Sequence, residues 1–234
     1  MVIAIIALLA GILVPAVAKA RDLAKQVTCL TRVHGQLQGV HMYAGAHGGH
    51  IPTGPDVPMA LPGGQQGPIL SHIASSQLWV GSLHAYNVQA VLLEDYLPAA
   101  EMLYCPDDDS NDPVEELAKI EQRGDEDAYG SYLYRQLDAR HPDQTPGRRI
   151  GKLGENPNGR PVRALILDMN SRMVIPGTPQ RTNHRGLRVN VGFEMGDAST
   201  FDNGDDALTL RAGDGMTVFN RLDEIFTHAD ALGE

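Results

Sequence analysis

The chain has 234 residues, a net charge of −10 and only 5% aromatic residues. Binding to nucleic acid requires clustered Lys and Arg, so this acidic balance argues against a nucleic-acid partner. It also argues against docking of the globular part on an anionic membrane surface. The 25 glycines and 15 prolines predict a loop-rich domain with a modest core.

An uncharged apolar segment, residues 1–18, opens the chain, and Lys19, Arg21 and Lys25 follow it. As a helix, this segment spans roughly 27 Å, slightly less than the roughly 30 Å hydrocarbon core of a bilayer. It therefore predicts a marginal transmembrane helix. The residues expected to face lipid or sister helices are Val2, Ile3, Ile5, Ile6, Leu8, Leu9, Ile12, Leu13 and Pro15.

Two other interpretations of this segment remain open. It is either a signal peptide cleaved near Ala18, although no basic segment precedes it, or a buried helix of a soluble domain. The basic residues after the segment also introduce a conflict. The positive-inside rule alone would keep the C-terminal part of the chain in the cytoplasm.

The sequence VIAIIALLAGILVPAVAKAR, followed by Cys29 and Leu30 in a continuing helix, resembles the N-terminus of type IV pilins and type II secretion pseudopilins. In that family prepilin peptidase removes a basic leader, and the exposed Phe is methylated. Pro15 falls where many members carry a helix-kinking proline, but the leader, the Phe and the family's Glu are lacking. Either the chain starts upstream of Met1 or it is a degenerate member of the family. The length of the span favours the upstream start, because about seven more apolar residues would make it a comfortable one.

Short segments of the C-terminal half resemble a group of pilin-like proteins with a domain of unknown function. They are Cys105-Pro106-Asp107, Gly130-Ser131-Tyr132, residues 164–168, Asn183-His184 and residues 190–193. In that group a His is followed, after a strand, by Asp-Gly, whereas this strand ends in Met195-Gly196-Asp197. The resemblance implies a non-enzymatic assembly subunit in the inner membrane, with its head in the periplasm or outside the cell. Its partners would be the bilayer, sister subunits or secretion machinery, and prepilin peptidase.

The predicted fold is α+β and pilin-like, with a small antiparallel sheet and long loops. Residues 1–48 form the membrane-anchoring and spine helix, and residues 49–234 form the extracytoplasmic head. Beyond the membrane, apolar residues at intervals of three and four predict one buried helix face. These residues are Leu23, Val27, Leu30, Val33, Leu37, Val40 and Ala44.

The head is predicted to contain strands at residues 102–105, 129–135, 162–168 and 187–195. The last of these alternates apolar and polar residues, as a half-buried strand does. Helices are predicted at residues 87–96 and after an Asp112 cap. A hairpin over residues 208–219 and a helix carrying Leu222, Ile225, Phe226 and Ala229 close the chain.

Two groups of oxygen donors suggest calcium binding, with surface solvation as the alternative. They are Asp107, Asp108, Asp109 and Asp112, and Asp202, Asn203, Asp205 and Asp206. The second group resembles in position the acidic calcium-binding loop of major pseudopilins, without EF-hand spacing. No other cofactor is predicted. The cysteines leave two alternatives open: a Cys29–Cys105 disulfide, allowed in an extracytoplasmic head, or two unpaired thiols.

Catalytic motifs are lacking in the sequence. There is no Gly-x-Ser-x-Gly elbow, and residues 147–152 are one residue short of a phosphate loop. An extended strand would hold His184 and Asp197 roughly 30 Å apart, too far for a dyad. His34 and His41 are about 10 Å apart along one helix face, too far to share an ion. The alternative to assembly is a signal-peptide or membrane-anchored ligand-binding protein, with a glycan as one candidate ligand.

Overall fold

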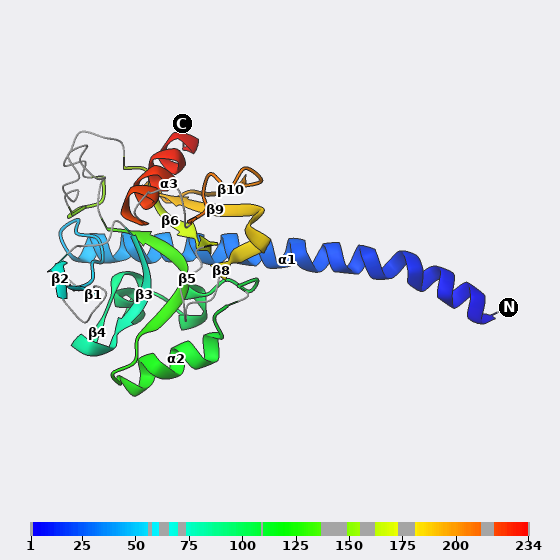
Figure 1. The fold of residues 1–234 in the computed structure, drawn as a ribbon, viewed down its shortest axis with the longest axis horizontal. Coiled ribbons are helices and arrows are strands. Elements are labelled where there is room, and N and C mark those ends of the chain that lie inside the picture. Colours follow the sequence, from blue (N-terminus) through cyan, green and yellow to red (C-terminus); the bar gives the residue numbers. More distant parts are fainter. Residues whose placement is uncertain are drawn as a thin grey trace.

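The computed structural model describes residues 2–55, 58–60, 66–69, 74–108, 110–136, 149–154, 162–172, 181–211 and 218–233. The protein is α+β, with a long N-terminal helix, α1 (Val2–Ala46), and a six-stranded antiparallel sheet (Figure 1). The order in the sheet is β10 (Ala198–Asp202), β9 (Arg188–Phe193), β6 (Ala164–Asp168), β5 (Ala128–Arg135), β3 (Ala74–Val80) and β4 (Ala85–Tyr86).

Shorter elements complete the described chain. Two strand pairs lie outside the main sheet, β1 (Pro58–Ala60) with β2 (Gln66–Ile69) and β7 (Asn170–Ser171) with β8 (Arg181–Thr182). The other helices are α2 (Pro113–Gln122), α3 (Val218–Leu232) and the 3₁₀ helices η1 (Gly81–Leu83), η2 (Val88–Leu93), η3 (Ala100–Leu103) and η4 (Asn183–Gly186).

Helices cover both faces of the sheet. The C-terminal half of α1 packs on one face, where Val33, Leu37 and Val40 meet Tyr132 and Ile166. Helix α3 packs on the opposite face in a second apolar cluster. Its members include the predicted helix residues Leu222, Ile225, Phe226 and Ala229, all buried, so this prediction is confirmed.

The buried stripe of α1 differs from the predicted one. Val33, Leu37, Val40 and Ala44 are buried as expected, but Leu23 and Val27 are 58% and 56% exposed. Polar Gln36 is buried instead, and its Nε2 donates a hydrogen bond to the Met102 carbonyl over 2.7 Å. Leu23 precedes the covered part of the helix, which begins near Gln26, and Val27 lies on a side of the helix that the head leaves exposed. The helix ends at Ala46, and Gly48 and Gly49 just after it take positive φ angles, which glycine adopts readily at the C-terminus of a helix.

The N-terminal half of α1 extends away from the head, and the C-terminal half lies within it (Figure 1). A search of the described residues finds no helix that is both long enough and apolar enough to cross a membrane. The sequence predicts a helix over residues 1–48 that is separate from a head over residues 49–234. In the structure the second half of α1 forms part of the core of that head.

Strand β9 corrects the prediction of a half-buried strand. Val189, Val191 and Phe193 face the α3 cluster, but Asn190 and Gly192 on the other face are also buried. A Cβ atom added at Gly192 would lie 2.7 Å from Val33 of α1. The residues between the apolar ones of β9 therefore do not face water. They lie on the face of the strand that packs closely against α1.

Other predicted elements have mixed outcomes. Helix α2 begins after Asp112, whose side chain accepts a hydrogen bond from the Val114 backbone amide, and β5 and β6 lie where strands were predicted. The prediction of a strand at residues 102–105 is wrong, because Met102 and Leu103 end η3, and Tyr104 and Cys105 follow it outside any strand. The predicted 208–219 hairpin is wrong in its last residues, which begin α3. Residues 212–217 lie outside the described chain.

Candidate functional site

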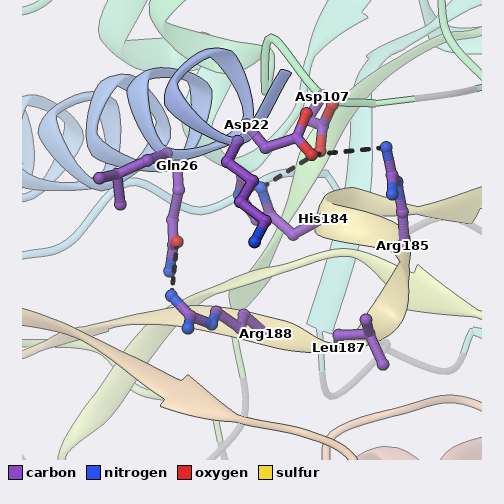
Figure 2. Close-up of a pocket in the computed structure, with 9 residues that line it drawn as sticks. Asp22, Gln26, Asp107, His184, Arg185, Leu187 and Arg188 are labelled. Atoms are coloured by element: carbon purple, nitrogen blue, oxygen red, sulfur yellow. Dashed lines mark hydrogen bonds and ion pairs between the residues drawn. The ribbon is translucent and has the colours of Figure 1, made fainter. Parts of the chain in front are cut away.

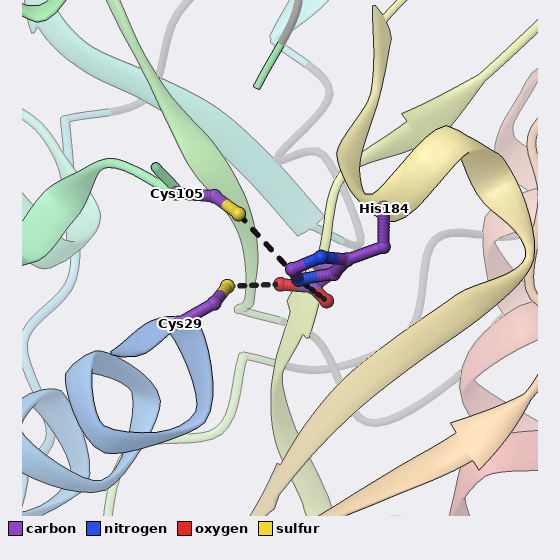
Figure 3. A group of neighbouring side chains, drawn as sticks. Cys29, Cys105 and His184 are labelled. Atoms are coloured by element: carbon purple, nitrogen blue, oxygen red, sulfur yellow. Dashed lines mark hydrogen bonds and ion pairs between the residues drawn. The ribbon is translucent and has the colours of Figure 1, made fainter. Parts of the chain in front are cut away.

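Four side chains that can bind a metal ion converge in the interior of the head. One ligand atom from each of Cys29, Cys105, Asp168 and His184 lies within 4.8 Å of the others, and all four residues are buried (Figure 3). We call this group the Cys–Asp–His cluster. Within the described part of the chain, no other group of three or more His, Cys, Asp or Glu residues meets this criterion.

Each member comes from a different segment. Cys29 lies on the buried face of α1, and Cys105 follows η3. Asp168 is the last residue of β6, on the sheet face that α1 covers. His184 lies in η4 with a φ angle of 50°, in the left-handed region that non-glycine residues rarely adopt. The three-layer packing therefore brings together residues separated by up to 155 positions.

Direct contacts link the four members. The Sγ of Cys29 lies 3.1 Å from Oδ1 of Asp168, to which it donates. The Nε2 of His184 lies 3.5 Å from both the Sγ of Cys105 and Oδ2 of Asp168. Nε2 is therefore the ring nitrogen that faces the centre of the cluster.

Further residues fix the orientation of the cluster. The Nδ1 of His184 lies 3.5 Å from Oδ2 of Asp107. The Asn190 backbone amide donates to Oδ2 of Asp168 over 2.8 Å, and the Asn190 side chain contacts Nε2 of His184 over 3.3 Å. The hydroxyl of Tyr132 lies 3.2 Å from the Sγ of Cys29. The cluster thus has a surrounding layer of polar contacts.

Burial and mutual contacts shift the ionisation of the cluster. Burial raises the pKa of Cys29, and its hydrogen bond with Cys105 adds to this increase. Burial acts in the same direction on Cys105, but hydrogen bonds with Cys29 and His184 outweigh it and lower the pKa of that thiol.

His184 and Asp168 both have raised pKa values. Burial lowers the pKa of His184, but the hydrogen bond with Cys105 and the charge of Asp168 raise it by more. Burial raises the pKa of Asp168 despite the opposing charge of His184. Relative to free side chains, the cluster therefore favours the charged forms of Cys105 and His184 and disfavours the charged forms of Cys29 and Asp168.

A pocket of about 290 Å³ reaches the cluster from outside. His184 and Asp107 line it, together with residues of α1 and β9 that include Gln26 and Arg188 (Figure 2). Arg188 donates to the side-chain oxygen of Gln26 over 2.8 Å across this pocket. The Asp107 edge of His184 is therefore the side of the cluster that is nearest to solvent.

The cysteines were predicted either to form a disulfide or to remain unpaired. In the structure both are free thiols, and both are buried in the same cluster. The sequence did not connect them with Asp168 or His184, because it gave no register for β6 or η4. One signal in the sequence was usable: Cys105, Asp168 and His184 all lie in the short segments of the C-terminal half singled out above.

The residues predicted to bind calcium are engaged in other contacts. Asn203 is buried, and its side chain bonds to Gly186, Leu208 and Thr209. Asp206 forms ion pairs with Arg172 and Arg211, and the Asp202 and Asp205 carboxylates accept backbone amides of their own loop. Calcium binding at this loop stays a prediction.

In the other predicted calcium-binding group, the described Asp residues also contact different partners. Asp107 pairs with Lys25 and contacts His184, and Asp108 accepts a hydrogen bond from Ser131. Asp112 caps α2, and Asp109 lies outside the described residues.

His34 and His41 belong to no metal-binding group among the described residues, in line with the distance expected between them. Of the histidines that follow on the chain, His47 stacks on Tyr43, and Nδ1 of His50 contacts the Gly151 carbonyl. The carboxylates beside His184 are Asp107 and Asp168, whereas Asp197 is exposed after β9.

The second candidate surface is the apolar half of α1 that extends from the head. Its exposed side chains include Ile3, Ile6, Leu9, Ile12, Leu13 and Pro15. The side chains of Val2, Ile5 and Leu8 lie outside the described part. Ile12 and Val14 are 67% and 68% exposed. They point in directions about 160° apart, because successive residues turn by about 100°.

Comparison of the chain with protein-family models, curated proteins and solved structures gives no match.

Proposed function

We propose that this protein is a pilin-like assembly subunit of a type II secretion or type IV pilus-like machine. The observation that carries the proposal is the apolar half of α1, which extends from the head with Ile3, Ile6 and Ile12 between 60% and 83% exposed. Side chains of this size on a free surface require an apolar partner. The role is structural and not enzymatic.

The partner is a bilayer before assembly and the equivalent helices of sister copies within the fibre. A single protein groove would cover one side of α1, whereas Ile12 and Val14 lie on nearly opposite sides. Lipid, or several neighbouring helices, covers all sides. The inner membrane, prepilin peptidase and an extracytoplasmic head belong to the same proposal, through the sequence resemblance described above.

The second half of α1 supports this function mechanically. Val33, Leu37 and Val40 are completely buried in the head, so the helix cannot move independently of the sheet. A force applied to the extended half of α1 would therefore be transmitted to the head through one continuous helix. This arrangement suits a subunit that is held in an assembly by its N-terminus.

A charge substitution in the extended helix tests the proposal. Ile12→Asp should move the protein from the membrane fraction and abolish oligomers, because a charge at the centre of an apolar helix costs about 2.5–3.5 kcal/mol on insertion. Val114→Asp is the matched control, since Val114 is 76% exposed on the head. Equal membrane retention and equal oligomer yield for the two variants would contradict the proposal.

A second candidate, the membrane-anchored ligand-binding protein, is favoured by the charged pocket beside α1. Lys19, Arg185 and Arg188 line this pocket together with Asp22 and Asp107. Such a protein would still need its anchor but would not form oligomers. Membrane-bound monomers of the unaltered chain would favour this candidate over assembly.

A further inference from the structure

We propose that the Cys–Asp–His cluster is a structural zinc site that fastens α1 to the head. The ligands are Sγ of Cys29, Sγ of Cys105, a carboxylate oxygen of Asp168 and Nε2 of His184. This proposal is independent of the assembly function, because it concerns the interior of the head and not the extended helix.

The donor types and spacing fit a tetrahedral ion. Zinc bonds of about 2.0–2.3 Å to N, O and S place neighbouring ligand atoms about 3.3–3.8 Å apart. The Sγ of Cys105 lies 3.5 Å from Nε2 of His184. Cys29 Sγ lies 3.1 Å from Oδ1 of Asp168 and His184 Nε2 lies 3.5 Å from Oδ2, so each of these ligands is close to one oxygen of the carboxylate. The remaining pairs lie within 4.8 Å, so small side-chain movements complete the tetrahedron.

Two sulfur donors select the class of ion. Calcium and magnesium bind oxygen ligands, whereas thiolate and imidazole donors together favour zinc. Four protein ligands leave no open position, and closed sites of this kind have structural roles. On binding, the protons that the two thiol groups, Asp168 and Nε2 of His184 hold are released to solvent, so that two thiolates, a carboxylate and a neutral imidazole become the ligands. The ion then offsets two of the three buried negative charges.

The surrounding contacts match those of histidine ligands in zinc sites. A ligating imidazole typically donates its other N–H to a carboxylate, which fixes the tautomer and the ring orientation. Here Asp107 is placed to accept from Nδ1 of His184, and Lys25 of α1 pairs with the same carboxylate over 2.7 Å. The Asn190 side chain, 3.3 Å from Nε2, would give up that contact to the ion.

The position of the site determines its effect. Cys29 belongs to α1, and the other three ligands belong to segments of the head. An ion at this point therefore joins the helix to η4 and the end of β6. The pocket that reaches His184 and Asp107 provides the path by which the ion enters.

Metal binding is tested on the full chain, folded and fully reduced in detergent. Zn²⁺ alone is titrated against a chromophoric chelator, and Co²⁺ alone is titrated by absorption spectroscopy. We expect one Zn²⁺ per chain, a higher melting temperature with Zn²⁺, and tetrahedral Co²⁺ bands with thiolate-to-cobalt charge transfer. Absence of Zn²⁺ uptake, or a Co²⁺ spectrum without sulfur bands, would overturn the proposal.

Substitutions then assign the ligands. His184→Asn should lower zinc affinity by more than about 100-fold, and Asp107→Asn by about 10–100-fold, as for outer contacts of metal ligands. The matched controls are His50→Asn and Asp125→Asn, both at exposed positions, which should leave affinity unchanged. Unchanged affinity in His184→Asn would contradict the site. If that variant does not fold, Asp107→Asn and the wild-type cobalt spectrum decide.

The oxidation state of the cysteines is the remaining check. Thiol labelling and peptide mass analysis of the natively isolated protein should find Cys29 and Cys105 reduced and protected by the ion. A native Cys29–Cys105 disulfide would instead show that the two sulfurs are used for a covalent link, and it would overturn the zinc proposal.

Discussion

Arg135 of β5 and Asp230 of α3 form a buried ion pair in which one guanidinium nitrogen lies 2.9 Å from each carboxylate oxygen. The same carboxylate accepts the backbone amides of Arg163 and Ala164. The pair therefore joins α3 to two neighbouring strands on the sheet face opposite α1.

Asp230→Ala should lower the free energy of unfolding by about 3–5 kcal/mol, because it leaves the Arg135 charge buried without this carboxylate. Urea denaturation measures the change. The double variant Arg135→Met with Asp230→Leu removes both charges and should be less destabilised than Asp230→Ala. A double variant that is as unstable as the single one would mean that shape, and not charge, sets the cost.

The contact between Gly192 and α1 predicts a second effect. Gly192→Ala places a Cβ atom 2.7 Å from the Val33 side chain and 2.9 Å from the Leu37 side chain, so these side chains, or the helix that carries them, must shift. We expect a loss of about 1–3 kcal/mol, as for other overpacked cores. Gly124→Ala is the control, because a Cβ atom there meets nothing within 4 Å. Equal melting temperatures for the two variants would be evidence against close packing of α1 on β9.

The N-cap of α2 predicts a smaller effect. Asp112→Ala removes the side-chain acceptor for the Val114 amide, 2.9 Å away, and should cost about 1 kcal/mol. Asp112→Asn keeps an acceptor and should restore most of the stability in the same urea experiment. Identical stability for the Ala and Asn variants would rule out a capping role.

The two halves of α1 predict different consequences of deletion. A chain that begins at Arg21 retains Val33, Leu37 and Val40 and should keep the melting temperature of the head. It loses the exposed apolar side chains from Ile3 to Val17 and should remain monomeric without detergent. Calorimetry and light scattering measure the two properties. A large fall in melting temperature would mean that the extended half also stabilises the head.

Much of the fold could be predicted from local sequence patterns. The Asp112 cap followed by Pro113 determines α2, and the apolar residues from Leu222 to Ala229 determine the face of α3. Local patterns failed where tertiary contacts decide. Gln36 is buried because it reaches the Met102 carbonyl, and Asn190 is buried because α1 covers its face of β9. Met102 is far from Gln36 in the sequence, and α1 is far from Asn190.

The candidate site was less predictable than the fold. Cys29 and Cys105 were noticed as a pair, but Asp168 was considered only as the end of a strand, and His184 was considered for catalysis only together with Asp197. Their convergence depends on the pairing of β6 with β9 and on the left-handed conformation of His184. No spacing rule covers ligands drawn from four distant segments. The three-dimensional arrangement was needed to find the cluster.

Photo-crosslinking through the extended half of α1 tests the assembly function most directly. A photoreactive amino acid is placed at position 12 of the full chain in native membranes, and the same group at position 114 of the head is the control. The account predicts ladders of self-crosslinked copies from position 12 and none from position 114. Crosslinks from position 12 to lipid alone, with no crosslinked copies under assembly conditions, would contradict it.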